Sequence, residues 1–502
     1  MRRIFAITLA VACVVLGVTG TRAESKISAA TEECLGCHTS IHPGIVEGWK
    51  KSRHAATTPA EALAVEGLAR KITGQKIPED LKNVSLGCAE CHSLNASSHK
   101  DTFDHNGTSI HVVVSPKDCA TCHVEEADQF DKNLMAHAHG ILVNNSLYKT
   151  LMGAINDTPL FDKGKVATKP ANPHTEAESC LYCHGTKLEV TGSVTRETDM
   201  GEMTFPVISG WPNQGVGRIN LDGSRGSCAA CHTRHEFSIE MARKPYTCRE
   251  CHVGPDVPAS KVYEASKHGN IFSSKNSGWN FTNVPWTVGK DFTAPTCAAC
   301  HISLLTDTEG KVVVKRSHEV KDRLPYRIFG LVYAHSHPRE PDTSVIRNKD
   351  GLPLPTDFAG GSADKFLYDE KERTAAKKAM QASCLSCHHQ SWVDGHWERF
   401  VNTIGETNAT VLAGTRIMTD IWQLGLATNH QKGGSPFDEY IERVWSDSWL
   451  FYANTIRFAS AMGGGGDYGV FADGRYHLSK TVRQLEDWLN QRKPAKGKPS
   501  LK

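Results

Sequence analysis

The chain has 502 residues, of which 39% are hydrophobic and 22% are charged, and its formal net charge is +2. A balance so close to neutral gives no indication of a nucleic acid or of a strongly charged macromolecule as a partner. Seventeen cysteines are more than ordinary packing requires, so they point to a specific chemistry.

The first residues have the features of an export signal. Two arginines precede an apolar run from Ile4 to about Val18, which is too short for a comfortable membrane-spanning helix. Small residues allow cleavage after Ala23, so we predict a signal peptide over residues 1–23 and an exported mature chain. The alternatives are a retained amphipathic anchor and a lipoprotein modified at Cys13. No later stretch approaches the ~18 apolar residues of a transmembrane helix, so no transmembrane anchor is expected.

Sixteen cysteines form eight copies of the motif Cys-x-x-Cys-His, and Cys13 alone is left over, in the leader. Two thiols three positions apart can form thioethers with the two vinyl groups of one haem, while the adjoining histidine ligates the iron. One isolated copy could instead belong to a zinc site or a redox dithiol. Eight copies predict eight covalently bound c-type haems. The motifs are Cys34/Cys37/His38, Cys88/Cys91/His92, Cys119/Cys122/His123, Cys180/Cys183/His184, Cys228/Cys231/His232, Cys248/Cys251/His252, Cys297/Cys300/His301 and Cys384/Cys387/His388.

The spacing of the motifs indicates how the chain is organised. They extend from Cys34 to His388, so residues 24–400 are predicted to form one octahaem domain in which helices and long irregular segments wrap the haems. The interval from Cys228 to Cys248 is too short for an independent domain, and it should place the fifth and sixth haems close together.

Helical periodicity replaces the motifs in residues 401–491, which are predicted to form a helical region packed on the haem domain. Ser435-Pro436 has the form of an N-cap followed by proline at the first helical position, so a helix is expected to begin there. The basic residues 492–502 are expected to form a disordered tail. A second amphipathic helix is expected to carry Val482, Leu485 and Leu489.

A haem that only carries electrons needs a second axial ligand, and seventeen histidines lie outside the motifs. A haem left without a second histidine would have an open position for chemistry. The candidate distal ligands in short helix-like settings are His54, His137 or His139, His235, His268 and His396. The sequence does not rank His99, His105, His111, His174, His318, His335, His337 and His430.

Several segments resemble the octahaem hydroxylamine oxidoreductases and occur in that family's order. Together with the eight motifs, they extend the resemblance over most of the mature chain. The segments are Gly-Trp-Pro-Asn-Gln-Gly-Val-Gly-Arg-Ile-Asn at 210–220, Gly-Ser-Cys-Ala-Ala-Cys-His-Thr-Arg-His-Glu-Phe-Ser at 226–238, Cys-His-Val-Gly-Pro-Asp at 251–256, Ser-Lys-His-Gly at 266–269 and Pro-Asp-Thr-Ser-Val-Ile-Arg-Asn-Lys-Asp-Gly-Leu-Pro-Leu-Pro at 341–355.

The resemblance implies a mainly α fold, a homotrimer, and a periplasmic or equivalent extracytoplasmic location. It also implies redox chemistry on a small nitrogen substrate at one five-coordinate haem, with the other seven relaying electrons to a cytochrome or quinone-linked redox partner. By motif order the open haem is the fourth, attached at Cys180 and Cys183 with His184 as its only protein axial ligand. In oxidising members a tyrosine of a neighbouring subunit is bonded to that haem. Tyr468 is the match here, with an ordinary packed tyrosine as the alternative.

Two departures from the family leave the direction of the reaction open. The hydroxylamine oxidisers usually have Gly-Pro-Asp-His-Pro after the sixth motif, whereas Val257 follows Asp256 in this chain. Val257 cannot take a proton, while Asp256 could carry protons or cap a turn. The Trp-His-Gly that tends to follow the tyrosine is replaced by Phe-Ala-Asp-Gly at 471–474.

The predicted function is therefore multi-electron redox of hydroxylamine or a related small nitrogen compound at the fourth haem. The alternative within the enzyme class is a nitrite or hydroxylamine reductase that forms ammonia, which Val257 favours and Tyr468 disfavours. Hydrazine oxidation is a third possibility. The alternative from another class is a non-catalytic electron conduit in which every haem is ligated by two histidines.

Overall fold

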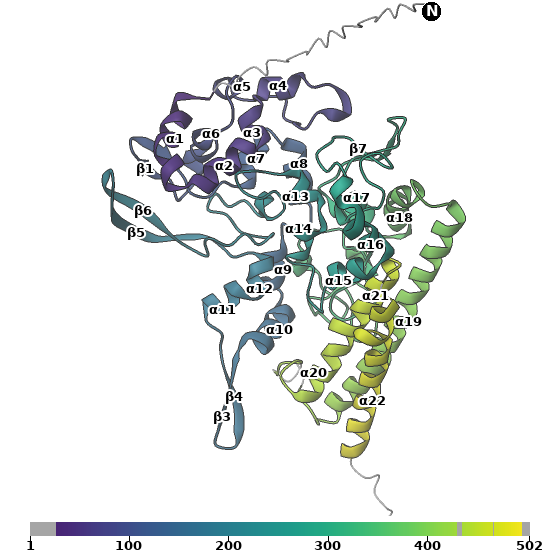
Figure 1. Cartoon of the computed structure of the whole chain (residues 1–502). Coiled ribbons are helices and arrows are strands. Elements are labelled where there is room, and N and C mark those ends of the chain that lie inside the picture. Colours follow the sequence, from purple (N-terminus) through teal and green to yellow (C-terminus); the bar gives the residue numbers. More distant parts are fainter. Residues whose placement is uncertain (1–26, 429–433, 465, 494–502) are drawn as a thin grey trace, which may run out of the picture.

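The computed structural model describes residues 27–428, 434–464 and 466–493, so the predicted signal peptide and nearly all of the basic tail lie outside the described residues. The chain runs from a cluster of short N-terminal helices, through a central region of helices and irregular segments, to a bundle of long C-terminal helices (Figure 1). Helices far outnumber strands, which confirms the mainly α prediction.

The N-terminal part is built from short helices that begin at clear capping signals. Thr58 accepts from the backbone N–H of Glu61, whose carboxylate accepts from the N–H of Thr58, and Ser115 and Asp118 form the same kind of capping box. The helices are α1 (Ala29–Ile41), α2 (Pro43–Lys51), α3 (Arg53–Ala56), α4 (Pro59–Ala64), α5 (Glu79–Lys82), α6 (Cys88–His92), α7 (Pro116–Ala120), α8 (Val124–Asp131), α9 (Ala138–Asn144) and α10 (Ser146–Asn156).

Several haem motifs are themselves single helical turns. This conformation places residues three apart on the same side of the helix, so both thiols of a motif reach one haem. Three helices coincide with complete motifs: α6, α12 (Cys180–His184) and α17 (Cys297–His301). The other helices of the central region are α11 (Pro173–Glu178), α13 (Ile239–Arg243), α14 (Pro245–Arg249), α15 (Ala259–Ala265), α16 (Lys267–Lys275) and α18 (Glu370–Leu385).

The strands form small separate sheets rather than a shared core. Two hairpins, β3–β4 and β5–β6, lie on either side of α11 and α12 in the sequence and project from the body (Figure 1). All pairs are antiparallel except β7–β8. The strands are β1 (Phe103–His105), β2 (Thr108–Ile110), β3 (Thr158–Asp162), β4 (Lys165–Lys169), β5 (Glu189–Thr198), β6 (Gly201–Ser209), β7 (Trp286–Thr287), β8 (Leu305–Thr306), β9 (Val312–Val314), β10 (Tyr326–Arg327) and β11 (His335–Ser336).

The C-terminal region is helical, as predicted, but its second helix begins later than the sequence suggested. Phe437 is buried in the core, and its backbone N–H donates to Ser435 Oγ, so Ser435 closes a turn instead of capping a helix. The helix begins at Tyr440, where Glu439 and Glu442 form a capping box. The elements are α19 (Gln390–Gln423), α20 (Tyr440–Asp447), the π-helical turn Ser448–Tyr452, α21 (Ala453–Ala461), the π-helical turn Tyr468–Ala472 and α22 (Arg475–Arg492).

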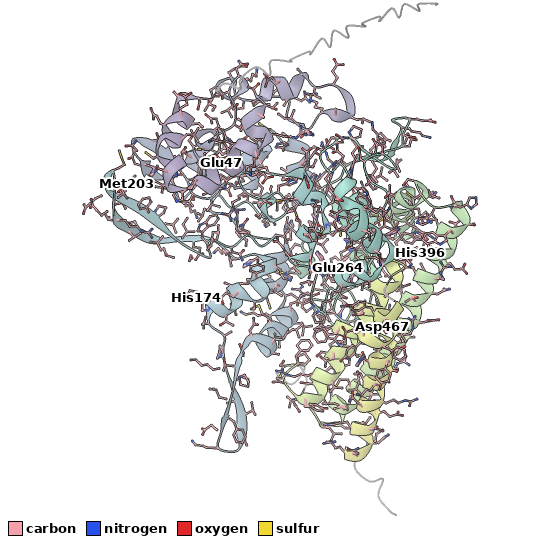
Figure 2. All side chains as sticks on the ribbon, viewed as in Figure 1. Glu47, His174, Met203, Glu264, His396 and Asp467 are labelled. Atoms are coloured by element: carbon pink, nitrogen blue, oxygen red, sulfur yellow. The ribbon has the colours of Figure 1, made fainter. Side chains whose placement is uncertain are left out.

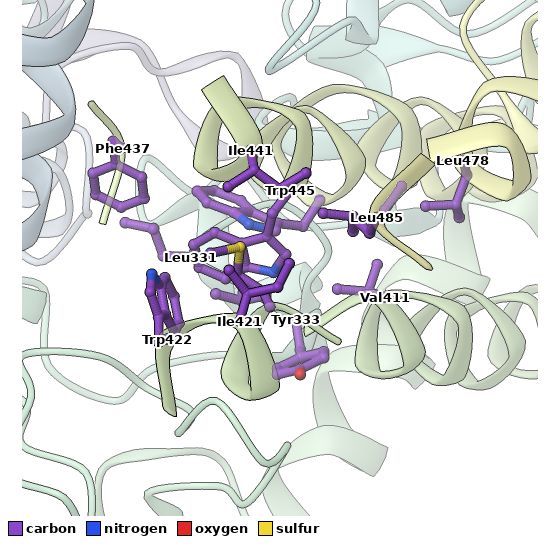
Figure 3. Close-up of a cluster of buried hydrophobic side chains, with 14 of the residues drawn as sticks. Leu331, Tyr333, Val411, Ile421, Trp422, Phe437, Ile441, Trp445, Leu478 and Leu485 are labelled. Carbon is purple, nitrogen blue, oxygen red and sulfur yellow. The ribbon is translucent and has the colours of Figure 1, made fainter. Parts of the chain in front are cut away.

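The largest hydrophobic cluster lies where α19, α20 and α22 meet (Figure 3). Leu485 and Leu489 of α22 are buried in it, which confirms the predicted amphipathic helix. Gly414 of α19 lets α22 approach, since a Cβ there would lie 3.3 Å from Leu485 Cδ1. Trp445 Nε1 donates to Thr415 Oγ1 at 3.0 Å, so its polar atom is satisfied inside the core. Within the described residues, no helix combines the length and the apolar character needed to cross a membrane.

Candidate haem and substrate sites

The motif cysteines are not paired with one another. All sixteen lie outside disulfide bonds in the described chain. Among the described residues, the group of three or more donors that lie close enough to hold a metal ion is His99, His111 and Asp118, which contains no thiol. No motif thiol belongs to such a donor group within the described residues.

Thiols of different motifs lie side by side and influence each other. A hydrogen bond from the thiol of the second motif lowers the pKa of Cys34 to about 7, and the same contact raises the pKa of Cys88. The thiol hydrogen bonds between motifs are Cys34 with Cys88, Cys119 with Cys228, Cys248 with Cys297 and Cys183 with Cys251. Electrostatic contacts join Cys91 with Cys122, Cys231 with Cys248 and Cys300 with Cys384.

These contacts set the order in which attached haems would follow one another. Motifs one, two, three, five, six, seven and eight form a continuous series, and the fifth lies next to the sixth as the short interval predicts. The fourth motif joins this series through Cys183 and Cys251 of the sixth motif. The pKa of Cys180 is raised mainly by burial and lowered by hydrogen bonds with Asn156 and Ser179. The fourth motif is therefore a side branch of the series.

Two of the predicted haem-binding cysteines differ from the others in their surroundings. Cys37 and Cys387 are exposed to solvent, whereas the remaining motif cysteines are buried or half-buried. The sequence made no prediction about how exposed each motif cysteine is, and these two are the most exposed. The reason is their position, because Cys37 belongs to the first motif and Cys387 to the eighth, which stand at the two ends of the series. A thioether at either thiol would therefore lie at the protein surface.

Four motif histidines face a second imidazole at the separation expected for two axial ligands. An iron held between two imidazoles by bonds of about 2 Å leaves the ring centroids roughly 6 Å apart. His54 and His268 are two of these partners, as predicted ligands, while His105 and His318 could not be ranked from the sequence. The centroid distances are 6.1 Å for His38 and His105, 6.3 Å for His54 and His123, 6.4 Å for His232 and His318, and 6.0 Å for His268 and His388.

His92 has two histidine neighbours, His111 and His235, which lie near it in different ways. Its ring lies 6.1 Å from that of His111, but His92 Nδ1 donates to the backbone oxygen of His111 at 2.8 Å. A ligating histidine commonly donates its other ring N–H to a carbonyl, so His111 lies on the side away from the iron. The predicted ligand His235 also lies near His92, since burial and then His92 lower the pKa of His235 to about 4. His235 has a φ of 69°, a strained left-handed conformation for a residue with a side chain.

Three other predicted ligands are placed differently. His137 Nε2 donates to the Asp131 carbonyl at 2.8 Å, and His396 Nε2 donates to the Ala461 carbonyl at 3.2 Å. Both bonds engage Nε2, and His396, a residue of α19, reaches α21 through its bond (Figure 2). His139 Nδ1 donates to the Gly185 carbonyl at 2.6 Å, which places its buried ring beside the fourth motif.

The cluster of His99, His111 and Asp118 is a buried hydrogen-bonding unit. The two rings stack at 3.7 Å, and His99 Nε2 lies 3.2 Å from Asp118 Oδ2. Both ring nitrogens of His111 face backbone carbonyls, at 3.2 and 2.9 Å. Stacked parallel rings of this kind, in which both nitrogens of His111 face carbonyls, are not oriented to bind one ion.

His184 is held in a way that leaves the other side of its ring open to non-histidine groups. His184 Nδ1 donates to the Ala138 carbonyl at 3.2 Å, so His139 lies on the side of the non-ligating nitrogen. Burial lowers the pKa of His184, Asp256 raises it and Arg327 lowers it further. The groups that act electrostatically on this ring are the Asp256 carboxylate, the Arg327 guanidinium and the His139 imidazole.

Three segments distant in sequence meet beside the fourth motif. Val257, Phe329 and Tyr468 all pack against a buried cluster made of Val262, Phe458 and Ala459. Asn454 of α21 donates its side-chain N–H to the Asp256 carbonyl at 2.9 Å. The structure thus places Tyr468 in the same packed cluster as Val257, the residue that follows Asp256.

Comparisons with known proteins agree with this architecture. Residues 217–323 match a family described as "Seven times multi-haem cytochrome CxxCH". Over 288 residues the chain is 26% identical to a probable nitrite reductase-hydroxylamine oxidoreductase fusion protein of Kuenenia stuttgartiensis, covering 54% of this chain and 25% of that protein. The chain therefore spans about a quarter of the length of this curated relative.

Two solved structures have the same fold. A hypothetical multiheme protein is 39% identical, with a TM-score of 0.87 over 93% of this chain and 96% of that one. A reducing protein complex of Kuenenia stuttgartiensis that resembles hydroxylamine oxidoreductase has 16% identity and a TM-score of 0.59, over 92% of this chain and 85% of that one.

Covalent haem motifs in a mainly helical fold with these relatives define a multihaem c-type cytochrome. Within that class, the chain belongs with the multiheme protein that is 39% identical to it, and at lower identity it is similar to two proteins whose names refer to hydroxylamine oxidoreductase.

Proposed function

We propose that the protein is an octahaem oxidoreductase that transforms hydroxylamine or a related small nitrogen compound at the haem of the fourth motif. The observation that carries this proposal is the position of that motif, which branches from the series of motif thiols at the sixth motif alone. A haem that only conducts belongs in the series, whereas a branch ends at a substrate. The remaining seven haems accept or deliver electrons, and the haem supplies the redox chemistry while the protein controls ligation and proton supply.

The residues around the fourth motif support chemistry there. Asp256 is exposed and is the carboxylate that acts on His184, so it is the proposed proton carrier. Tyr468 lies in the same packed cluster as Val257 and is the proposed site of any covalent bond to haem. Because that bond is made to a neighbouring subunit's haem in the resembling family, we propose a homotrimer.

A reductase that forms ammonia is the second candidate function. Val257 replaces the histidine of the oxidising members, and one solved structure with this fold is described as a reducing complex. In either direction electrons must enter or leave, so a cytochrome or quinone-linked partner is proposed. An extracytoplasmic location is also proposed, because c-type multihaem cytochromes are typically found there.

The first experiment is a spectroscopic titration of the purified holoprotein. A high-spin ferric haem that binds cyanide, and a ferrous haem that binds carbon monoxide, are expected. Low-spin haem alone, with neither ligand bound, would show a pure electron conduit. A red-shifted band in the anaerobically reduced protein that disappears in Tyr468→Phe would favour oxidation. Absence of the band in a protein with its full haem content would favour reduction of nitrite or hydroxylamine.

A further inference from the structure

The β3–β4 hairpin is an arm that nothing covers within the described chain. Every residue of both strands is exposed, and the hairpin projects from the body of the molecule (Figure 1). Phe161 and Val166 lie opposite each other and share one face, with 77% and 67% of their surfaces exposed. A two-stranded hairpin without a third strand or a covering helix is only marginally stable in water. The exposed apolar pair therefore marks the arm as a contact surface.

Lysines give this arm a basic character. Lys163 and Lys165 lie at its turn, Lys169 ends β4, and all three side chains are exposed. They outnumber Asp162, the acidic residue of the hairpin. None of the three lysines forms an ion pair within the described residues. The arm thus combines an uncovered apolar pair with an unbalanced positive charge, which favours an acidic partner.

The β5–β6 hairpin has the opposite charge at its tip. Glu197 and Glu202 lie directly opposite each other, Asp199 lies in the turn between them, and all three carboxylates are exposed. The basic residue of this hairpin is Arg196, whose guanidinium lies 5.8 Å from the centroid of the Phe205 ring. No ion pair neutralises the three carboxylates in the part of the chain that the structure describes. Like charges at opposed positions destabilise a hairpin, so a cationic partner would stabilise this tip.

The basic arm and the acidic tip cannot meet within one copy of the chain. The two hairpins form separate sheets, and they project from the body in different directions (Figure 1). Two copies can meet if the basic arm of the first reaches the acidic tip of the second. Such a contact joins two different surfaces, so it is heterologous, and each copy keeps its other hairpin for a further neighbour.

We propose that the basic β3–β4 arm of one copy binds the acidic tip of the β5–β6 hairpin of a second copy, head to tail. Lys163 and Lys165 pair with Glu197 and Glu202, and the contact buries Phe161. Head-to-tail contacts close into a ring or extend into a filament, and a homotrimer is one such ring. The inference supplies a contact surface for the homotrimer proposed above, and it holds whether or not the fourth haem is catalytic.

The experiment is sedimentation velocity of the purified holoprotein over a range of concentrations. It is done at about 20 mM and about 500 mM salt, where the Debye length is roughly 20 Å and roughly 4 Å, so that a charged contact weakens between the two. The reversed-arm variant is Lys163→Glu with Lys165→Glu, the reversed-tip variant is Glu197→Lys with Glu202→Lys, and the combined variant has all four changes.

The matched control is Lys371→Glu with Lys378→Glu, which makes the same change of charge as the reversed arm at two exposed lysines of α18. Phe161→Ser tests the apolar part of the contact. The haem absorption spectrum of each variant checks that the chain has folded and carries its haems.

Wild type should associate at low salt and associate more weakly as the salt concentration rises. Either reversed variant should weaken association at least about 10-fold at low salt, because attractive contacts become repulsive. The combined variant has an acidic arm and a basic tip, so its association should return to within about 3-fold of wild type, which damage to either hairpin would not allow. Phe161→Ser should weaken association about 10-fold at both salt concentrations, because salt does not screen an apolar contact. The control should associate like wild type.

Two results would overturn the proposal. The first is reversed-arm and reversed-tip variants that associate like wild type, which would leave any homotrimer to another surface. The second is a wild-type protein that stays monomeric at low salt. Vesicles of phosphatidylglycerol are then added, and binding that is lost in Phe161→Ser would assign the arm to an anionic lipid surface. Neither result bears on the fourth haem, whose function is tested separately by cyanide and carbon monoxide binding.

Discussion

The carboxyl group of Glu442 should make the stability of the C-terminal region depend on pH. Glu442 is 0% exposed. Its carboxylate accepts hydrogen bonds from Trp422 Nε1 at 2.8 Å and from the backbone N–H of Glu439 at 3.0 Å, which is part of the capping box. Burial raises its pKa from 4.5 to about 7, with Asp438 adding to the rise against the opposing hydrogen bonds. The folded protein therefore favours the protonated form.

The sign and size of the pH dependence follow from the difference between the ordinary pKa of 4.5 and the raised pKa of about 7. The stabilising contribution is complete below pH 4.5 and is lost as the pH rises to about 7. Across this window the free energy of unfolding should fall by about 3 kcal/mol from this group. Glu442→Gln does not titrate, so it should remove this part of the pH dependence.

The measurement is denaturant unfolding of the holoprotein, followed by far-UV circular dichroism, between pH 4.5 and pH 8. Wild type and Glu442→Gln are compared with Glu486→Gln, which removes an exposed carboxylate from α22. The control should keep the wild-type pH dependence. If Glu442→Gln also keeps it, Glu442 is ionised throughout and the reasoning is wrong.

Three further variants test the haem sites and the core. His268→Ala should leave the eighth haem without its second imidazole, adding one high-spin signal to the electron paramagnetic resonance spectrum; an unchanged spectrum would show that His268 is no ligand. Gly185→Ala should abolish carbon monoxide binding at the fourth haem while the other haems remain, because φ is +89° and a Cβ would collide with the Arg218 backbone; unaltered binding would refute this. Leu485→Ala should lower the free energy of unfolding by about 2–5 kcal/mol in the same denaturation assay, since Leu485 is fully buried; a loss below about 1 kcal/mol would mean that the cluster rearranges.

The sequence predicted the parts of this protein that depend on local spacing. The motif turns and the helix around Leu485 are local, because one helical turn decides which residues share a face. The beginning of α20 was placed too early, because the burial of Phe437 is a tertiary effect that overrides the proline signal at 436. The exposure of Cys37 and Cys387 is a tertiary property, about which the sequence made no prediction.

The histidine partners of the motif histidines could not be predicted from local sequence patterns. His105 and His318 reach their motifs through the folding of distant segments, so no neighbouring residues distinguish them from other histidines.

The sixth motif lies next to three others, the fourth, the fifth and the seventh, so three paths for electrons would meet at its haem. With substrate at the fourth haem, as proposed, every electron exchanged with it crosses the contact between Cys183 and Cys251. From there two routes diverge, one through the fifth motif toward the first, and one through the seventh toward the eighth. A multi-electron reaction could therefore fill or empty two arms in parallel. Damage confined to the fourth motif would leave both arms joined, converting an enzyme into a simple conductor.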